Sequence, residues 1–142
     1  MTEHPSLPWS KPLQELLERH PDLRRIDQPE RLEYFRNDLN VDLPPMIRDL
    51  LLKSRPDVVL QPSKEEHLFE IFALARDHRI PLTLRGAGTW GYGGAVPTQG
   101  GILIDLGFMD RIEVDPENLQ VTLRPGARFL DIQHAEAARA AK

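Results

Sequence analysis

The sequence predicts an α/β fold, a small mixed sheet with flanking helices, preceded by a helical N-terminal extension. Two observations predict it. Short apolar runs alternate with one long amphipathic segment after residue 55, as in β-α-β units. All nine glycines lie between Gly86 and Gly126, whereas prolines interrupt the preceding residues. We therefore divide the chain into an extension over residues 1–54 and an α/β module over residues 55–142.

The extension contains two candidate helices. Asp27 and Glu30 have the spacing of a capping box, with Pro29 in the first turn. The helix that follows has its apolar residues on one side: Leu32, Phe35 and Leu39. Residues 45–53 carry another apolar group: Met46, Ile47, Leu50 and Leu51. Apolar residues at helical spacing usually face a core, so we expect both helices to pack against the main body.

A β-α-β unit opens the second part. The apolar residues 58–60 predict a strand that ends before Pro62, and residues 80–85 predict the next one. Between them, Ser63 and Glu66 have capping-box spacing. The predicted helix has apolar residues at positions i, i+3, i+4 and i+7: Leu68, Ile71, Phe72 and Ala75. Crossovers of this kind normally join parallel strands.

The remaining elements follow from shorter signals. Residues 102–106 predict a third strand. Residues 111–115 and 119–123 flank a Pro-Glu-Asn turn and predict a hairpin. From Arg128 onward the pattern is helical.

The segment 86–91 has the pattern G-x-G-x-x-G directly after a predicted strand. In a Rossmann loop the third glycine opens a helix that faces a pyrophosphate. Here more glycines and Pro97 follow Gly91, and each internal glycine costs a helix ~1 kcal/mol and a proline ~3 kcal/mol. We therefore disfavour a Rossmann NAD-binding loop. Asp105 stands roughly where the ribose-binding acid would be, and we interpret that position as coincidental.

The glycine-rich segment is nevertheless suited to anion binding. Its glycines allow close backbone approach and positive φ, and successive N–H groups can form an anion-binding concavity. Thr89 adds a hydroxyl group, and Arg85 adds a positive charge that could instead pair with Asp105. Apolar and aromatic residues among the glycines are unusual for a solvated linker: Trp90, Tyr92, Ala95 and Val96. We expect a binding loop rather than a flexible surface loop.

Composition excludes several function classes. The net charge of -4 argues against nucleic acid as the main partner. The absence of cysteine excludes disulfides, thiolate metal sites and cysteine nucleophiles. No apolar run reaches the ~20 residues of a transmembrane helix, and no secretory signal is present. We expect no metal site, with His67 and His78 as surface or helix-cap residues, and no catalytic residue is assigned.

Several short motifs occur in a characteristic order. They are P-D-V-V from residue 56, P-S-K-E-E from 62, I-P-L-T-L-R-G-A-G-T from 80, G-G-A-V-P from 93, G-I-L-I-D-L from 101, M-D-R-I from 109 and R-P-G from 124. Together they resemble the first lobe of the FAD-binding domain of the vanillyl-alcohol oxidase / p-cresol methylhydroxylase (PCMH-type) flavoproteins. Among these, the chain most resembles the FAD-linked oxidases that include glycolate oxidase and D-lactate dehydrogenase. The resemblance covers residues 55–142, with a weaker match at residues 34–38.

The resemblance implies a cofactor and a set of contacts. In the family, such a loop wraps the FAD pyrophosphate with its backbone amides. The implied contacts are Arg85, Gly86, Ala87, Gly88 and Thr89, followed by Trp90, Gly91, Tyr92, Gly93 and Gly94. Some members attach FAD through a histidine or a cysteine, but this loop has no histidine and the chain no cysteine. The resemblance therefore implies non-covalent FAD.

The resemblance also implies an activity that this chain would share with absent parts. The full enzyme would transfer a hydride from a 2-hydroxy acid, such as glycolate or D-lactate, to the flavin. The family's second FAD lobe and substrate domain are not in the sequence, so substrate groups would come from a missing C-terminal domain or a partner subunit. The expected location is cytoplasmic, or peripheral at the inner face of a membrane. An isolated lobe is expected to bind flavin weakly, to be only marginally stable and to self-associate.

Two alternatives remain open from the residues. The chain could be a non-catalytic scaffold or interaction subunit that keeps the lobe. It could also be a Rossmann NAD-binding protein, which a helix after Gly91 would favour. An irregular loop from Thr89 to a strand at Ile102 would favour the FAD lobe or the scaffold.

Overall fold

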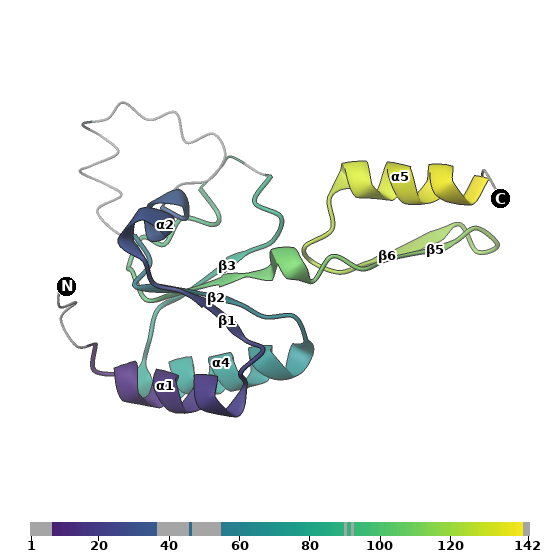
Figure 1. Ribbon diagram of the computed structural model, residues 1–142. Coiled ribbons are helices and arrows are strands. Elements are labelled where there is room, and N and C mark those ends of the chain that lie inside the picture. Colours follow the sequence, from purple (N-terminus) through teal and green to yellow (C-terminus); the bar gives the residue numbers. More distant parts are fainter. Residues whose placement is uncertain (1–6, 37–45, 47–54, 90, 92, 141–142) are drawn as a thin grey trace.

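The computed structural model describes residues 7–36, 46, 55–89, 91 and 93–140. These residues form a four-stranded sheet with helices on both faces, and a hairpin with a helix that projects from one side (Figure 1). Helices α1 (Ser10–Arg19) and α4 (Glu65–His78) lie on one face of the sheet, and α2 (Pro29–Tyr34) lies on the other. The predicted α/β class with a small mixed sheet is confirmed.

The strand order of the main sheet is β1-β2-β4-β3. Strands β2 (Val58–Gln61), β4 (Ile102–Asp105) and β3 (Leu82–Arg85) are parallel, whereas β1 (Arg24–Ile26) pairs antiparallel with β2. The crossover through α4 therefore joins the parallel strands β2 and β3, as predicted. These two strands are not neighbours, because β4 lies between them. Strand β1 was not predicted, because three residues with one buried apolar side chain are too short to show a period.

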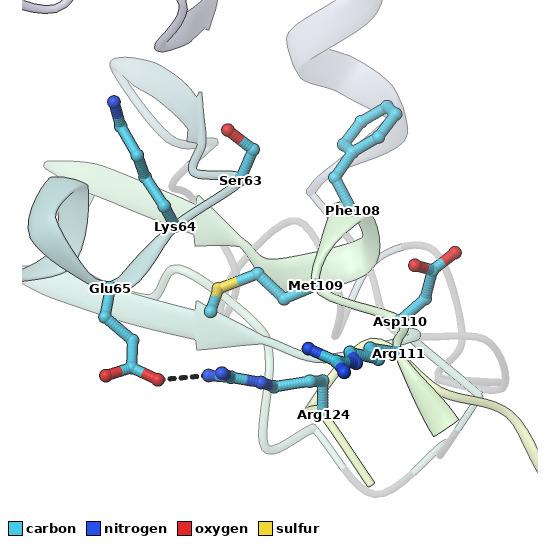
Figure 2. Close-up of a pocket in the computed structure, with 8 residues that line it drawn as sticks. All are labelled: Ser63, Lys64, Glu65, Phe108, Met109, Asp110, Arg111 and Arg124. Atoms are coloured by element: carbon cyan, nitrogen blue, oxygen red, sulfur yellow. Dashed lines mark hydrogen bonds and ion pairs between the residues drawn. The ribbon is translucent and has the colours of Figure 1, made fainter. Parts of the chain in front are cut away.

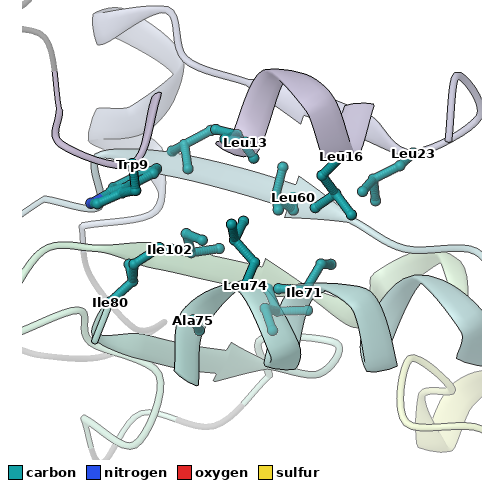
Figure 3. Close-up of a cluster of buried hydrophobic side chains, with 12 residues drawn as sticks. Trp9, Leu13, Leu16, Leu23, Leu60, Ile71, Leu74, Ala75, Ile80 and Ile102 are labelled. Atoms are coloured by element: carbon teal, nitrogen blue, oxygen red, sulfur yellow. The ribbon is translucent and has the colours of Figure 1, made fainter. Parts of the chain in front are cut away.

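The two faces of the sheet have separate apolar cores. Val58 and Leu60 of β2, with Ile102 and Ile104 of β4, face α1 and α4. Figure 3 shows Leu13 and Leu16 of α1 and Ile71 and Leu74 of α4 around Leu60. The alternate residues Val59 and Leu103 contact Ile26, Leu32 and Phe35 on the other face. Since β2 and β4 are buried on both faces, their sequences are continuous apolar runs.

The predicted packing of Leu32 and Phe35 is confirmed, because both side chains are buried in the second core. The predicted capping box is wrong. Helix α2 begins at Pro29 with Gln28 as N-cap and no side-chain cap hydrogen bond. The Asp27 carboxylate pairs instead with Arg25 at 2.7 Å. Leu39 and the segment 45–53 lie outside the described residues, apart from Met46, which is exposed.

Helix α4 also differs from its predicted details. It begins at Glu65 after Lys64, so Ser63 and Glu66 do not form the predicted capping box. Its buried residues are His67, Ile71, Leu74 and Ala75. Phe72 is 40% exposed, so the buried stripe is rotated relative to the predicted one. The rotation follows from the burial of His67, a polar residue that a hydrophobic pattern does not count.

The C-terminal arm, residues 111–140, consists of β5 (Ile112–Asp115), β6 (Gln120–Leu123) and α5 (Phe129–Ala140). The predicted hairpin and final helix are confirmed. A 3-10 turn, η1 (Leu106–Phe108), connects β4 to the arm. The N–H of Gly126 donates to the carbonyl of Met109 at 2.8 Å and closes the base of the arm. All four residues of β6 are exposed, so the arm contributes little to the two cores.

Candidate functional site

The glycine-rich segment leaves the carboxyl end of β3 and returns to the amino end of β4. In α/β sheets, ligands bind outside the carboxyl ends of parallel strands. No helix occurs in the described residues between Gly86 and Gly101. The described residues of this segment are irregular until β4 begins at Ile102, and this does not support the Rossmann alternative.

One side of this loop is open. A Cβ atom added at Gly93 or Gly94 would meet no atom of the described residues within 4 Å, and Gly93 has a φ of +83°. Thr89 is exposed. A ligand can therefore approach this stretch of backbone directly, and its N–H groups suit an anion. This observation fits the donor set that a pyrophosphate needs.

The other side of the loop is closely packed. A Cβ atom at Gly86 would lie 2.8 Å from the carbonyl oxygen of Pro125, at the base of the C-terminal arm. Gly88 has a φ of +66°, and a Cβ atom there would lie 2.6 Å from Nε of Arg85. Glycine is thus required at both positions, for close approach at Gly86 and for approach and conformation at Gly88.

Arg85 is buried beneath the loop, with 5% of its surface exposed. Its guanidinium carbon lies 5.5 Å from the ring centroid of Tyr34 and 5.6 Å from that of Phe35. Asp105, the alternative partner considered for Arg85, accepts hydrogen bonds from Gln61 Nε2 at 2.8 Å and from the N–H of Gly107 at 3.1 Å. Trp90 and Tyr92 lie outside the described residues, and Gly91 is partly buried.

Pockets that enclose drug-sized ligands measure roughly 300–1,000 Å³, and a whole dinucleotide needs at least as much space. The pocket at the loop measures about 220 Å³ and contains Ala87. Its other lining residues precede the C-terminal arm (Gly107 and Asp110) or belong to it (Gly126, Arg128 and Asp131). Of these, Asp110 and Gly126 belong to the motifs that carry the family resemblance, and the other three residues gave no signal in the sequence. The hydrogen bond from Arg128 to Asp131 lowers the pKa of the Asp131 carboxyl and occupies the guanidinium.

A larger pocket of about 450 Å³ lies where α4 begins, and no predicted site residue lines it (Figure 2). Its basic side chains are Lys64, Arg111 and Arg124. Each has a carboxylate partner: Lys64 pairs with Asp22, Arg111 with Glu113 and Arg124 with Glu65. Figure 2 shows the Arg124–Glu65 pair at the pocket's edge. Since these charges are already compensated, the pocket is not built to bind an anion.

His20, Asp22 and His67 form a polar cluster whose potential ligand atoms lie within 4.8 Å of one another. The predicted surface position of His67 is wrong, because its ring is fully buried; its predicted capping alternative fits better. Nδ1 accepts from the N–H of Ser63 at 3.4 Å, which leaves Nε2 to donate to Asp22 at 3.2 Å. His78 is exposed at the last residue of α4, as predicted.

These hydrogen bonds give the cluster a structural role. A metal on Nε2 of His67 would require a proton on Nδ1, facing the N–H of Ser63. The ammonium group of Lys64, 3.0 Å from Oδ2 of Asp22, also opposes a cation. We therefore interpret His67 as a buried residue that connects the start of α4 to the turn after α1.

Asp22 gives this connection a predictable pH dependence. The hydrogen bond from Lys64 holds the pKa of the Asp22 carboxyl below its ordinary value of 3.8. A lowered pKa in the folded state stabilises the fold above the unfolded pKa, and this stabilisation is lost as the pH falls through the folded value. We expect Asp22→Asn to lower the melting temperature at neutral pH, with a difference that shrinks below about pH 4. In a Lys64→Met background the pH-dependent part of the difference should become smaller. A difference that is constant from neutral to acidic pH would contradict this role.

Comparisons with known proteins agree with the loop's geometry. The model of the family described as "FAD binding domain" matches residues 56–141. Glycolate oxidase subunit GlcD of Bacillus subtilis (strain 168) is 38% identical over 84 residues, 58% of this chain and 18% of that protein. D-lactate dehydrogenase of Anaerostipes hadrus is 31% identical over 120 residues, 76% of this chain and 25% of that protein. The chain thus spans a quarter or less of the length of these relatives.

Solved structures show the same fold. p-Cresol methylhydroxylase matches with a TM-score of 0.76 at 19% identity, over 93% of this chain and 25% of that one. Alkyldihydroxyacetonephosphate synthase matches with a TM-score of 0.74 at 16% identity, over 98% of this chain and 26% of that one. The shared fold therefore includes the described part of the N-terminal segment. Since the family model matches more than half of the chain, the chain belongs to the FAD binding domain family.

Proposed function

We propose that this chain is the FAD-binding portion of an FAD-dependent oxidoreductase and that the loop at residues 85–94 binds the cofactor's pyrophosphate through backbone N–H groups. The open backbone at Gly93 and Gly94 carries the proposal, because a pyrophosphate needs N–H donors that it can reach. The cofactor would bind non-covalently, since the chain has no cysteine and the loop no histidine.

Within this proposal the chain binds and orients the cofactor. Bound FAD supplies a hydride acceptor, and the protein determines where its reactive ring lies. The names of the relatives support a 2-hydroxy acid such as glycolate or D-lactate as the substrate of the whole enzyme. The groups that bind that acid would come from a further domain or a partner subunit, because the described loop offers backbone donors rather than a proton acceptor near the open side.

The proposal includes a cytoplasmic location, or a peripheral one at the inner face of a membrane. None of the helices in the described part of the chain is long and apolar enough to span a membrane. We also retain the predicted division of the chain, with residues 1–54 as an extension of the lobe formed by residues 55–142.

A titration of the purified chain with FAD and with NAD tests the proposal. We expect saturable binding of FAD and no binding of NAD. Binding is measured by the change in flavin fluorescence and by quenching of tryptophan fluorescence. Binding should be weak, with a dissociation constant of roughly micromolar to millimolar, because the pocket described at Ala87 is too small to enclose the cofactor. Absence of FAD binding by the folded chain would contradict the proposal and favour the non-catalytic scaffold. Binding of NAD instead would show that the glycine pattern is a Rossmann loop.

A further inference from the structure

We propose that Arg85 is a positioning residue for the glycine loop and that Tyr34 and Phe35 hold it in place. Arg85 would then position the loop from beneath rather than contact the cofactor directly. The predicted effect on FAD affinity rests on the proposed function, whereas the predicted effect on the loop itself does not.

The first step is the placement of the guanidinium group against the aromatic pair. Arg85 ends β3 and lies on the sheet face that α2 covers. Its guanidinium carbon is within 5.6 Å of both ring centroids, which is inside the ~6 Å range of a cation–π contact. The rings of Tyr34 and Phe35 meet edge to face with their centroids 5.1 Å apart. The pair therefore forms a fixed support of two rings.

The second step is the contact with the loop. A Cβ atom at Gly88 would lie 2.6 Å from Nε, 2.7 Å from Nη2 and 2.9 Å from Cζ of Arg85. The guanidinium group thus lies between the aromatic pair and the backbone of Gly88. With 5% of its surface exposed, Arg85 presents little of itself to a ligand above the loop.

The third step is the consequence for the loop. A guanidinium group that packs against both the rings and Gly88 limits the conformations of the loop backbone. The planar guanidinium group fits between rings and backbone, whereas a lysine ammonium group is a compact, strongly hydrated point charge. Lysine should therefore not replace Arg85.

Tyr34 and Phe35 belong to residues 1–54, the predicted N-terminal extension. If they support Arg85, that segment contributes to the cofactor site without contacting the cofactor. Tyr34 is 70% exposed, so it can be changed with little disturbance of the core, whereas Phe35 is buried. Phe69 of α4 is 72% exposed and provides a matched phenylalanine control away from the loop.

The first measurement needs no cofactor. The chain has nine glycines, so ¹⁵N-glycine labelling gives a simple amide spectrum in which Gly86 and Gly88 can be identified by substitution. We expect Tyr34→Leu, Phe35→Leu and Arg85→Met to shift or broaden the signals of Gly86 and Gly88. The signal of Gly107 should remain, and Phe69→Leu should change none of the three. Unchanged loop glycines in Tyr34→Leu and Arg85→Met would overturn the inference.

The second measurement is the FAD affinity of the same variants at several salt concentrations. We expect Tyr34→Leu to weaken FAD binding about three- to tenfold and Arg85→Met to weaken it by tenfold or more. Arg85→Lys, which keeps the positive charge, should bind FAD no better than Arg85→Met. Riboflavin, which lacks the pyrophosphate, should be affected much less. Full affinity in Tyr34→Leu and Phe35→Leu, combined with loss of affinity and of salt dependence in Arg85→Met, would indicate direct contact and overturn the inference. If the wild-type chain does not bind FAD but the loop glycines respond as expected, the proposed function fails and the positioning role remains.

Discussion

Replacing Gly101 with alanine is expected to lower the free energy of unfolding by about 2–5 kcal/mol, the sum of backbone strain and steric overlap. Gly101 has a φ of +72°, and its added Cβ atom would overlap the carbonyl oxygen of Pro81. That oxygen accepts the hydrogen bond from the N–H of Ile102 at 2.9 Å, so it cannot move without opening the pairing of β3 and β4. The carbonyl of Gly101 accepts from the N–H of Asp57 at 2.9 Å, on the β2 side.

Urea unfolding of a graded series checks this expectation. Gly94 has free space around its added Cβ, so Gly94→Ala should leave stability unchanged or raise it by up to about 1 kcal/mol. Gly100 has a φ of +69° but only a 3.2 Å contact with the Asp57 carboxylate, so Gly100→Ala should cost about 1–2 kcal/mol. Equal losses at all three positions would show that the Pro81 contact is unimportant.

Replacing Gly88 with alanine is expected to weaken FAD binding at least about tenfold, which corresponds to ~1.4 kcal/mol. The new methyl group would occupy the space of the Arg85 guanidinium group, and the φ of +66° is unfavourable for alanine. Because a side chain can move whereas a backbone carbonyl cannot, the chain should remain folded. The loss should therefore appear in affinity more than in stability.

Gly100→Ala is the matched control for this prediction. It introduces the same left-handed strain outside the proposed contacts, so it should lose comparable stability and keep its FAD affinity within about threefold. The comparison is made by fluorescence titration at a temperature where circular dichroism shows all three proteins folded. Equal losses of affinity in Gly88→Ala and Gly100→Ala would assign the effect to general destabilisation rather than to the loop.

Local patterns were sufficient for most of the elements. Val58, Val59 and Leu60 predicted a buried strand because a strand between two covered faces has no polar side. The glycines after Gly91 excluded a Rossmann helix because they favour irregular backbone. The motif order predicted the family, and the match over residues 56–141 confirms it. The assignment of individual residues to FAD contacts stays a prediction.

Patterns failed where a distant residue determined the outcome. Ser63 and Glu66 have the spacing of a capping box, but the ring of His67 bonds the N–H of Ser63 and is itself bonded to Asp22, far away in the sequence. Strand β1 exists because Arg24–Ile26 pairs with β2, and a three-residue strand has too little periodicity to be seen.

The sequence by itself determined the helices and strands of the second part, the irregular loop and its family, because these depend on local propensity and residue spacing. Only the tertiary structure decided that β4 lies between β2 and β3, that Arg85 lies under Gly88, and that Tyr34 and Phe35 contact it. Those arrangements depend on which apolar faces cover one another. Contacts between residues far apart in the chain produce no regular spacing in the sequence, so they cannot be predicted from it.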